Sequence, residues 1–180
     1  DLGYEIWMTP DYERQVYTAL MEAGAEFSIQ NFGMRALLAM RLEKNFGTWF
    51  REFRPIYGPF EADLGRFVKL GKNNFIGQEA ARQEFEHGPK RSRVSFVVDA
   101  LDADVMGDEP IWHENNVIGW ITSGGYAHHV ERSLAQGYVP TEFSANADDG
   151  AFEIEILGER RKATLITDPL FDPKAERMRM

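Results

Sequence analysis

The sequence contains no cysteine, and this absence excludes several kinds of chemistry at once. Disulfide bridges, thiolate metal sites and cysteine nucleophiles all require the missing residue. No apolar run approaches the roughly 18 residues that a membrane-spanning helix needs, and no basic region precedes an apolar stretch as in a secretory signal. Internal repeats and low-complexity segments are also absent. With 43% hydrophobic and 27% charged residues, the composition is ordinary for a globular protein.

Basic residues are too few for a general nucleic-acid binder. The chain has 20 Lys and Arg against 29 Asp and Glu, which gives a net charge of -9. Contacts to phosphate groups need clustered cations, and one basic cluster is PKRSR at residues 89–93. We expect this cluster to be a solvated linker. The sequence therefore predicts neither a nucleic-acid partner nor a membrane partner.

The first residues have the pattern of a half-buried strand. Tyr4, Ile6 and Met8 alternate with Glu5 and Trp7, and a period of two residues is typical of a strand with one buried face. One strand and two or three helices cannot form a two-layer domain. We therefore expect the chain to begin in the middle of a domain, whose N-terminal half lies upstream.

Three helices are expected in the first half. Thr9 and Pro10 have the residue types of a helix N-terminus, and Gly24 that of a C-terminus. Apolar residues between them share one helical face. A second helix is predicted within residues 31–47 and a third within residues 75–88, where glycine and proline follow.

The second half changes to short strands separated by turn residues. Six runs rich in β-branched and aromatic residues are expected to form strands: RVSFVV, PIWH, VIGWIT, LAQGYV, FEIEIL and KATLIT. Their near-regular spacing indicates a small antiparallel barrel or sandwich. The predicted fold class is α+β, with one unit at residues 1–89 and a β-rich unit at residues 90–180.

Three motifs have a chemical interpretation and a plainer one. His128 and His129 lack a third ligand at a familiar spacing, so we expect solvated loop histidines and no metal site. TSGG at residues 122–125 lacks the features of a phosphate loop or a nucleophile elbow, and a tight turn after a strand is favoured. FGTWFREF at residues 46–53 is aromatic enough to line a pocket for a flat ligand.

Two charged residues are candidates for ligand contacts. The Glu5 carboxylate, close to Tyr4 and Trp7, can accept a pair of N–H donors or face solvent from its strand. Arg41 shares a helix face with Leu37, so its partly buried guanidinium needs an anion. That anion is either a structural carboxylate or a ligand. The residues alone favour a solvent-facing Glu5 and a structural ion pair for Arg41.

An ordered series of motifs resembles one known family. The series is GYEIW, NFGMRALLAMRLEKNFGTW, GPFEADLGRFVKL, NNFIGQEA, VIGWITSGGY, LAQGYVP and DPLFDP. Together these motifs resemble the aminomethyltransferase superfamily, which includes the T-protein of the glycine cleavage system and the folate domains of dimethylglycine and sarcosine dehydrogenases. Within it, RLEKNFGTWFREF is more similar to the dehydrogenase branch, because a lysine follows the glutamate and a tryptophan follows further on.

The resemblance implies that this chain is the C-terminal part of a folate-binding domain followed by the family's β-barrel. It implies that the Glu5 carboxylate binds the pterin ring of tetrahydrofolate, with Tyr4 beside it, and that Arg41 and Phe46 contribute to the same site. Leu37 stands where T-proteins have an arginine, so one folate contact is expected to be absent. The family's catalytic aspartate and any FAD domain lie upstream, so no catalytic residue is expected in this chain.

The implied function is one-carbon transfer. A methylated amine would yield a methylene unit that tetrahydrofolate captures as 5,10-methylene-tetrahydrofolate, with folate and the amine as small-molecule partners. The alternatives are a stand-alone glycine cleavage aminomethyltransferase or a folate-dependent demethylase of another substrate. A folate-binding scaffold for iron–sulfur assembly is disfavoured, since its cysteine motif is missing. The location implied is the cytoplasm in a bacterium or the mitochondrial matrix in a eukaryote.

Overall fold

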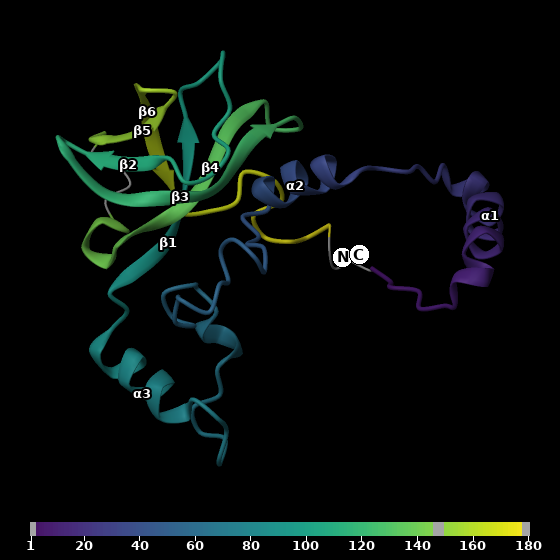
Figure 1. Cartoon of the computed structure of the whole chain (residues 1–180), viewed down its shortest axis with the longest axis horizontal. Helices are drawn as coiled ribbons and strands as arrows, with labels where there is room; N and C mark the ends of the chain where they lie inside the picture. The colour runs from purple at the N-terminus through teal and green to yellow at the C-terminus, as the bar shows by residue number, and fades with distance from the viewer. Residues whose placement is uncertain (1–2, 146–149, 178–180) are drawn as a thin grey trace.

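The second half of the chain is a closed antiparallel β-barrel. The computed structural model describes residues 3–145 and 150–177, and within them the strand order around the barrel is β1-β4-β3-β2-β5-β6 (Figure 1). All the pairings are antiparallel. The strands are β1 (Arg91–Val98), β2 (Pro110–His113), β3 (Asn116–Ala127), β4 (Arg132–Pro140), β5 (Phe152–Ile156) and β6 (Glu159–Ile166).

Alternating side chains explain why these segments close around a core. In β5, the inward-facing Phe152, Ile154 and Ile156 are buried, whereas the residues between them are only partly covered. Phe96 of β1 and Ile121 of β3 are fully buried in the same cluster. The sequence prediction of a barrel or sandwich is therefore confirmed, and the structure selects the barrel.

The described α-helices lie in the first half, as the sequence predicts. The α-helices are α1 (Glu13–Gly24), α2 (Met34–Glu43) and α3 (Gln78–His87). Short 3-10 turns are η1 (Pro10–Tyr12), η2 (Ala25–Phe27), η3 (Gly65–Phe67) and η4 (Thr141–Phe143). Gly88 has a φ of 80° directly after α3, a backbone angle that glycine adopts without steric cost and that ends a helix.

The three α-helices have different relations to the barrel (Figure 1). Helix α2 packs on it, against β3 and β4, with Leu42 buried against Ala127 and Leu134. Helix α1 stands away from the barrel at the end of an extended connection, and α3 lies on another side. Helix α2 therefore links the first half to the barrel wall.

The expected opening strand is not present. Residues 3–9 have an extended but unpaired backbone, and Tyr4 and Trp7 are 81% and 88% exposed. A strand needs a neighbour that accepts and donates its backbone hydrogen bonds, and the described residues provide none for this segment. Alternation in the sequence was therefore not sufficient to predict the structure here.

Two other motif interpretations were wrong. PKRSR is not a solvated linker, because Arg93 lies in β1, its side chain is 9% exposed, and it pairs with Asp63 at 3.5 Å. TSGG is not a turn, because Thr122 and Ser123 lie inside β3, where the pairing register with β4 shifts. The two hydroxyl groups point to a buried carboxylate instead of a solvent-exposed loop.

Candidate functional site

A cavity of about 490 Å³ lies where the end of α2, the β3–β4 turn and the C-terminal segment meet. Its size is within the usual range for small-molecule sites. Aromatic, aliphatic and charged side chains form its walls. They are Phe32, Leu37, Met40, Arg41, Glu43, Lys44, Phe46, His129, Phe171, Asp172 and Arg177.

The end of α2 places the central residues of this cavity. The helix ends at Glu43, and Asn45 then adopts a left-handed backbone with φ of 57°, a conformation that asparagine tolerates better than most residues. The amide of Phe46 donates to the Arg41 carbonyl at 2.9 Å and so closes the turn. This turn directs Lys44 and Phe46 to the cavity wall.

The C-terminal segment is attached to the same helix end. The Phe171 amide donates to the Glu43 carbonyl at 3.1 Å. Lys44 Nζ donates to the carbonyl of Asp172 at 2.7 Å and to its carboxylate at 3.2 Å. Partial burial opposes ionisation of Asp172, but the Glu176 amide and Lys44 outweigh it and lower the pKa of the carboxyl group. A charged contact therefore closes this side of the cavity.

Two aromatic rings flank the lysine. Lys44 Nζ lies 5.9 Å from the centroids of both the Phe46 and Phe171 rings, and the Arg177 guanidinium lies 5.3 Å from the Phe171 centroid. These distances are within cation–π range. His129 meets the Phe171 ring edge-on at 4.8 Å. The site thus combines flat apolar walls with positive charge.

Behind the cavity wall, Arg41 belongs to a buried polar network. Its Nη1 donates to the carboxylate of Glu52 at 3.0 Å, to Gln136 Oε1 at 3.1 Å and to the Phe46 carbonyl at 3.1 Å. Burial lowers the pKa of the Arg41 guanidinium, and the Glu52 carboxylate offsets part of this effect. Arg41 therefore joins α2, the following loop and β4.

Glu52 is fully buried at the centre of this network. Its carboxylate accepts hydrogen bonds from Thr122 Oγ1 at 2.6 Å, from Ser123 Oγ and from the Thr48 amide at 2.7 Å. Burial opposes the charge, but Arg41 and these donors lower the pKa of Glu52 below its usual value. Glu52 is therefore ionised and holds the loop against β3.

The structure brings together two of the four predicted cofactor contacts. Arg41 and Phe46 line this cavity, although the Arg41 guanidinium is largely used by Glu52. Tyr4 and Glu5 do not line it and lie in the exposed segment before α1. Sequence reasoning also missed Lys44, Phe171 and Arg177 as site residues. Lys44 and Phe171 lie inside the motifs RLEKNFG and DPLFDP, which could have drawn attention to them.

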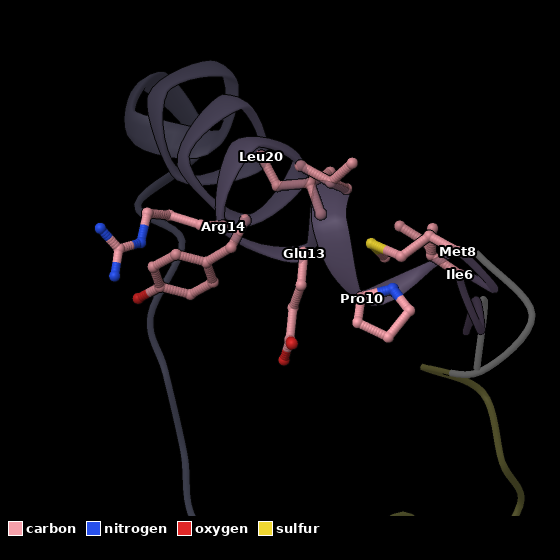
Figure 2. A pocket seen from close by; sticks show the side chains of 8 residues that line it. Ile6, Met8, Pro10, Glu13, Arg14 and Leu20 are labelled. Carbon is pink, nitrogen blue, oxygen red and sulfur yellow. The ribbon is translucent and has the colours of Figure 1, made fainter.

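A second concave surface lies on the N-terminal arm, by which we mean residues 3–24, the segment before α1 together with α1 itself. Ile6, Met8 and Pro10 face the side of α1 that carries Leu20, and the charged residues Glu13 and Arg14 also line this surface (Figure 2). Its volume is about 650 Å³, but its walls come only from this helix and the segment before it. Polar groups do not converge there, so the cavity at the end of α2 is the stronger candidate.

No described helix has the length and hydropathy to cross a bilayer. No group of three or more histidine, aspartate or glutamate side chains among those residues is arranged to hold a metal ion.

Two family models match the chain in sequence order. The GCVT N-terminal domain matches residues 1–72, and the glycine cleavage T-protein C-terminal barrel domain matches residues 91–172. Among curated proteins, mitochondrial dimethylglycine dehydrogenase of Rattus norvegicus is 38% identical over the whole chain. An aminomethyltransferase of Desulfitobacterium hafniense is 30% identical over 91% of the chain.

The chain spans only part of these relatives. It covers 21% of the rat protein and 44% of the bacterial one. A solved structure, the glycine cleavage system aminomethyltransferase T of Bartonella henselae, superposes with a TM-score of 0.79 at 23% identity. The superposition covers 91% of this chain and 45% of the other. At that identity the likeness establishes the fold.

Proposed function

Because the chain belongs to the glycine cleavage T-protein family, we propose that it forms part of the folate site of a one-carbon transfer protein. The observation that carries this proposal is the cavity at the end of α2, where Phe46 and Phe171 flank Lys44. Tetrahydrofolate has flat ring systems and a tail of carboxylates. Aromatic walls with cations between them match both parts of that ligand.

The residues have distinct proposed roles. Phe46 and Phe171 cover a ring of the ligand. Arg177 stacks on Phe171, has no ion pair in the described part of the chain and can meet a carboxylate. The role of Arg41 is to hold the cavity wall through Glu52. Glu5, with Tyr4 next to it, stays the proposed pterin contact on the strength of the family resemblance.

Bound tetrahydrofolate would supply the two nitrogens that take up a one-carbon unit. The role of this chain in the reaction is to bind and orient the folate and to exclude water from the cavity. Phe46 and Phe171 shield their side from solvent, and Lys44 holds the C-terminal segment across the opening through Asp172. These residues position the folate, and no proton transfer is assigned to them.

We further propose that the one-carbon unit comes from an N-methylated amine. Over its full length this chain is 38% identical to a dimethylglycine dehydrogenase, and it is 30% identical to an aminomethyltransferase over 91% of its length. The higher identity supports the dehydrogenase-like function over the alternative of a stand-alone aminomethyltransferase. Oxidation of such an amine needs an electron acceptor, and the proposal assigns FAD to residues outside these 180. Two measurements on the protein expressed from its complete gene test this step. They are its absorbance spectrum, which should show a flavin, and its ability to demethylate dimethylglycine.

Calorimetric titration with tetrahydrofolate tests the folate site itself. In the protein from the complete gene, Phe46→Ala removes one ring wall and is expected to weaken binding about tenfold. Glu5→Gln is expected to weaken it by about 2 kcal/mol, since a charge-assisted acceptor is lost. Phe50→Ala is the matched control, because Phe50 is 67% exposed and does not line the cavity.

The outcomes separate the two parts of the proposed site. If only Phe46→Ala weakens tetrahydrofolate binding, the folate lies in the cavity and Glu5 is not part of the site. If only Glu5→Gln weakens tetrahydrofolate binding, the folate site lies outside the cavity. If the wild-type protein binds no tetrahydrofolate, the family assignment remains and the proposed function is wrong.

A further inference from the structure

Glu43 is a buried carboxylate in the wall of the aromatic cavity, by which we mean the cavity of about 490 Å³ at the end of α2. The residue is only 5% exposed. In the described part of the chain, no cation forms an ion pair with it. Removing a carboxylate from water is costly unless the protein compensates for the loss. We therefore expect this side chain to have a specific partner.

The carboxylate of Glu43 holds the turn between β3 and β4. Its Oε1 accepts a hydrogen bond from the His129 amide at 2.8 Å. Close by in the chain, Leu42 is buried against Ala127 and Leu134, which lie on the two strands that this turn joins. The apolar contact brings the strands to α2, and the hydrogen bond then fixes the position of the turn.

The main chain of Glu43 holds the C-terminal segment. Its carbonyl accepts a hydrogen bond from the Phe171 amide at 3.1 Å. The rings of His129 and Phe171 meet edge-on, with their centroids 4.8 Å apart. Each of these three residues therefore contacts the other two, and all three line the aromatic cavity. Their contacts form a closed triangle between α2, the β3–β4 turn and the C-terminal segment.

This triangle affects the distance between the two ring walls of the cavity. Phe46 is fixed to the end of α2, because its amide donates to the Arg41 carbonyl at 2.9 Å. Phe171 belongs to a separate segment, and its ring is supported by His129, which Glu43 holds in place. A flat ligand between two rings requires a defined spacing between them. Glu43 is placed to set that spacing.

We propose that Glu43 is a positioning residue, which holds the β3–β4 turn and the C-terminal segment on α2 and thereby sets the width of the aromatic cavity. This inference rests on the proposed folate site and adds a residue that acts on the ligand through His129 and Phe171. Because no described cation pairs with Glu43, its role requires an acceptor oxygen and not a charge. Glutamine, which keeps such an oxygen, should therefore substitute for it.

Two measurements on the protein expressed from its complete gene test this role. They are calorimetric titration with tetrahydrofolate and hydrogen exchange, by mass spectrometry, of the peptides that contain His129 or Phe171. Glu43→Ala removes the acceptor oxygen, whereas Glu43→Gln keeps it. Glu84→Ala is the matched control, since the Glu84 carboxylate also accepts hydrogen bonds from backbone amides but does not line the cavity.

A second variant breaks the triangle at an exposed position. His129→Ala removes the ring that supports Phe171 but leaves the backbone amide that donates to Glu43. Because His129 is exposed, this variant is expected to fold even if Glu43→Ala does not.

The expected result is a loss that follows the acceptor oxygen. Glu43→Ala should weaken tetrahydrofolate binding about fivefold to tenfold, the size of one buried hydrogen bond, and should speed exchange in both peptides. Glu43→Gln should stay within about twofold of the wild type, and Glu84→Ala within about 1.5-fold. His129→Ala should weaken binding about threefold and speed exchange in the Phe171 peptide.

Four results would overturn the positioning role. If Glu43→Gln weakens binding as much as Glu43→Ala, the charge acts on the ligand directly. If Glu84→Ala weakens it as much, affinity follows general stability. If Glu43→Ala binds like the wild type, or if neither Glu43→Ala nor His129→Ala changes exchange at Phe171, the triangle does not set the cavity. A wild type that binds no tetrahydrofolate removes the folate site, and the exchange rates alone then decide whether Glu43 holds the two segments.

Discussion

Apolar side chains are buried in the barrel, whereas those of the N-terminal arm that precedes it are exposed. In the barrel, Phe96, Ile121 and Ile154 have no exposed surface. Helix α1 has no buried residue, and Tyr17 and Leu20 on its apolar face are 51% and 44% exposed. Both regions have the hydrophobic periodicity of their element. Periodicity therefore predicts the element, whereas burial depends on what packs against it.

The barrel supplies its own partners, and the arm does not. Each strand of the barrel pairs with two others, so the sheet closes without a free edge. Within the described residues, α1 has close contacts mainly with the 3-10 turns at its two ends, η1 and η2. Packing of an amphipathic face contributes most of the stability of a helix in a protein. The barrel should therefore be much more sensitive to loss of a side chain than the arm.

The largest effect should come from truncating a barrel core residue. Phe96→Ala removes a fully buried ring from the barrel core and should cost about 3–5 kcal/mol of unfolding free energy. Leu20→Ala in α1 removes a side chain that is 44% exposed and should cost less than about 1 kcal/mol. Chemical denaturation of both variants measures the difference. Equal losses would mean that the arm is packed in solution as tightly as the barrel.

A smaller loss is expected at the joint between α2 and the barrel, which the Arg41–Glu52 pair forms. Glu52→Gln leaves the Arg41 guanidinium buried without its counter-charge and should cost about 3 kcal/mol. Asp102→Asn is the control, because Asp102 is 68% exposed where it pairs with Arg161, and should cost less than about 1 kcal/mol. If the two changes have the same small effect, the Arg41–Glu52 pair does not hold α2 to the barrel.

The sequence predicted the elements that depend on local pattern. The α-helices and the six strands were expected near their observed positions, since each has its own periodicity and is bounded by turn residues. One exception is the segment from Tyr4 to Met8, which alternates like a strand but pairs with no neighbour among the described residues. Another is TSGG, which was expected to be a turn and lies inside β3. A strand is defined by its partner, and a single segment contains no information about that partner.

The candidate site was only partly predictable for the same reason. Arg41 and Phe46 are close in the sequence, and a partly buried arginine on an apolar helix face indicated a missing anion. Its partner Glu52 lies eleven positions further on, beyond the helix, and no local spacing rule identifies it. Phe171 reaches the cavity from more than a hundred residues away. Contacts between residues so far apart in the sequence arise from the closure of the barrel and not from any local pattern.

The smallest expected effect is a pH dependence confined to the joint. The pKa of Glu52 is lower in the folded protein than its ordinary value of 4.5, so its ion pair adds stability above pH 4.5 that is lost as the pH falls through the lower, folded-state pKa. Acid should therefore weaken the attachment of α2 to the barrel, because that attachment includes the Arg41–Glu52 pair. Denaturation of the wild type and Glu52→Gln between pH 7 and pH 3 measures this. Below pH 4.5 the wild type should progressively lose its extra free energy of unfolding over the variant. The loss should be complete only when Glu52 is fully protonated in the folded protein. A constant gap across that range would show that Glu52 has the same pKa in the folded and the unfolded protein, and the stability of the joint would then come from its hydrogen bonds and not from its charge.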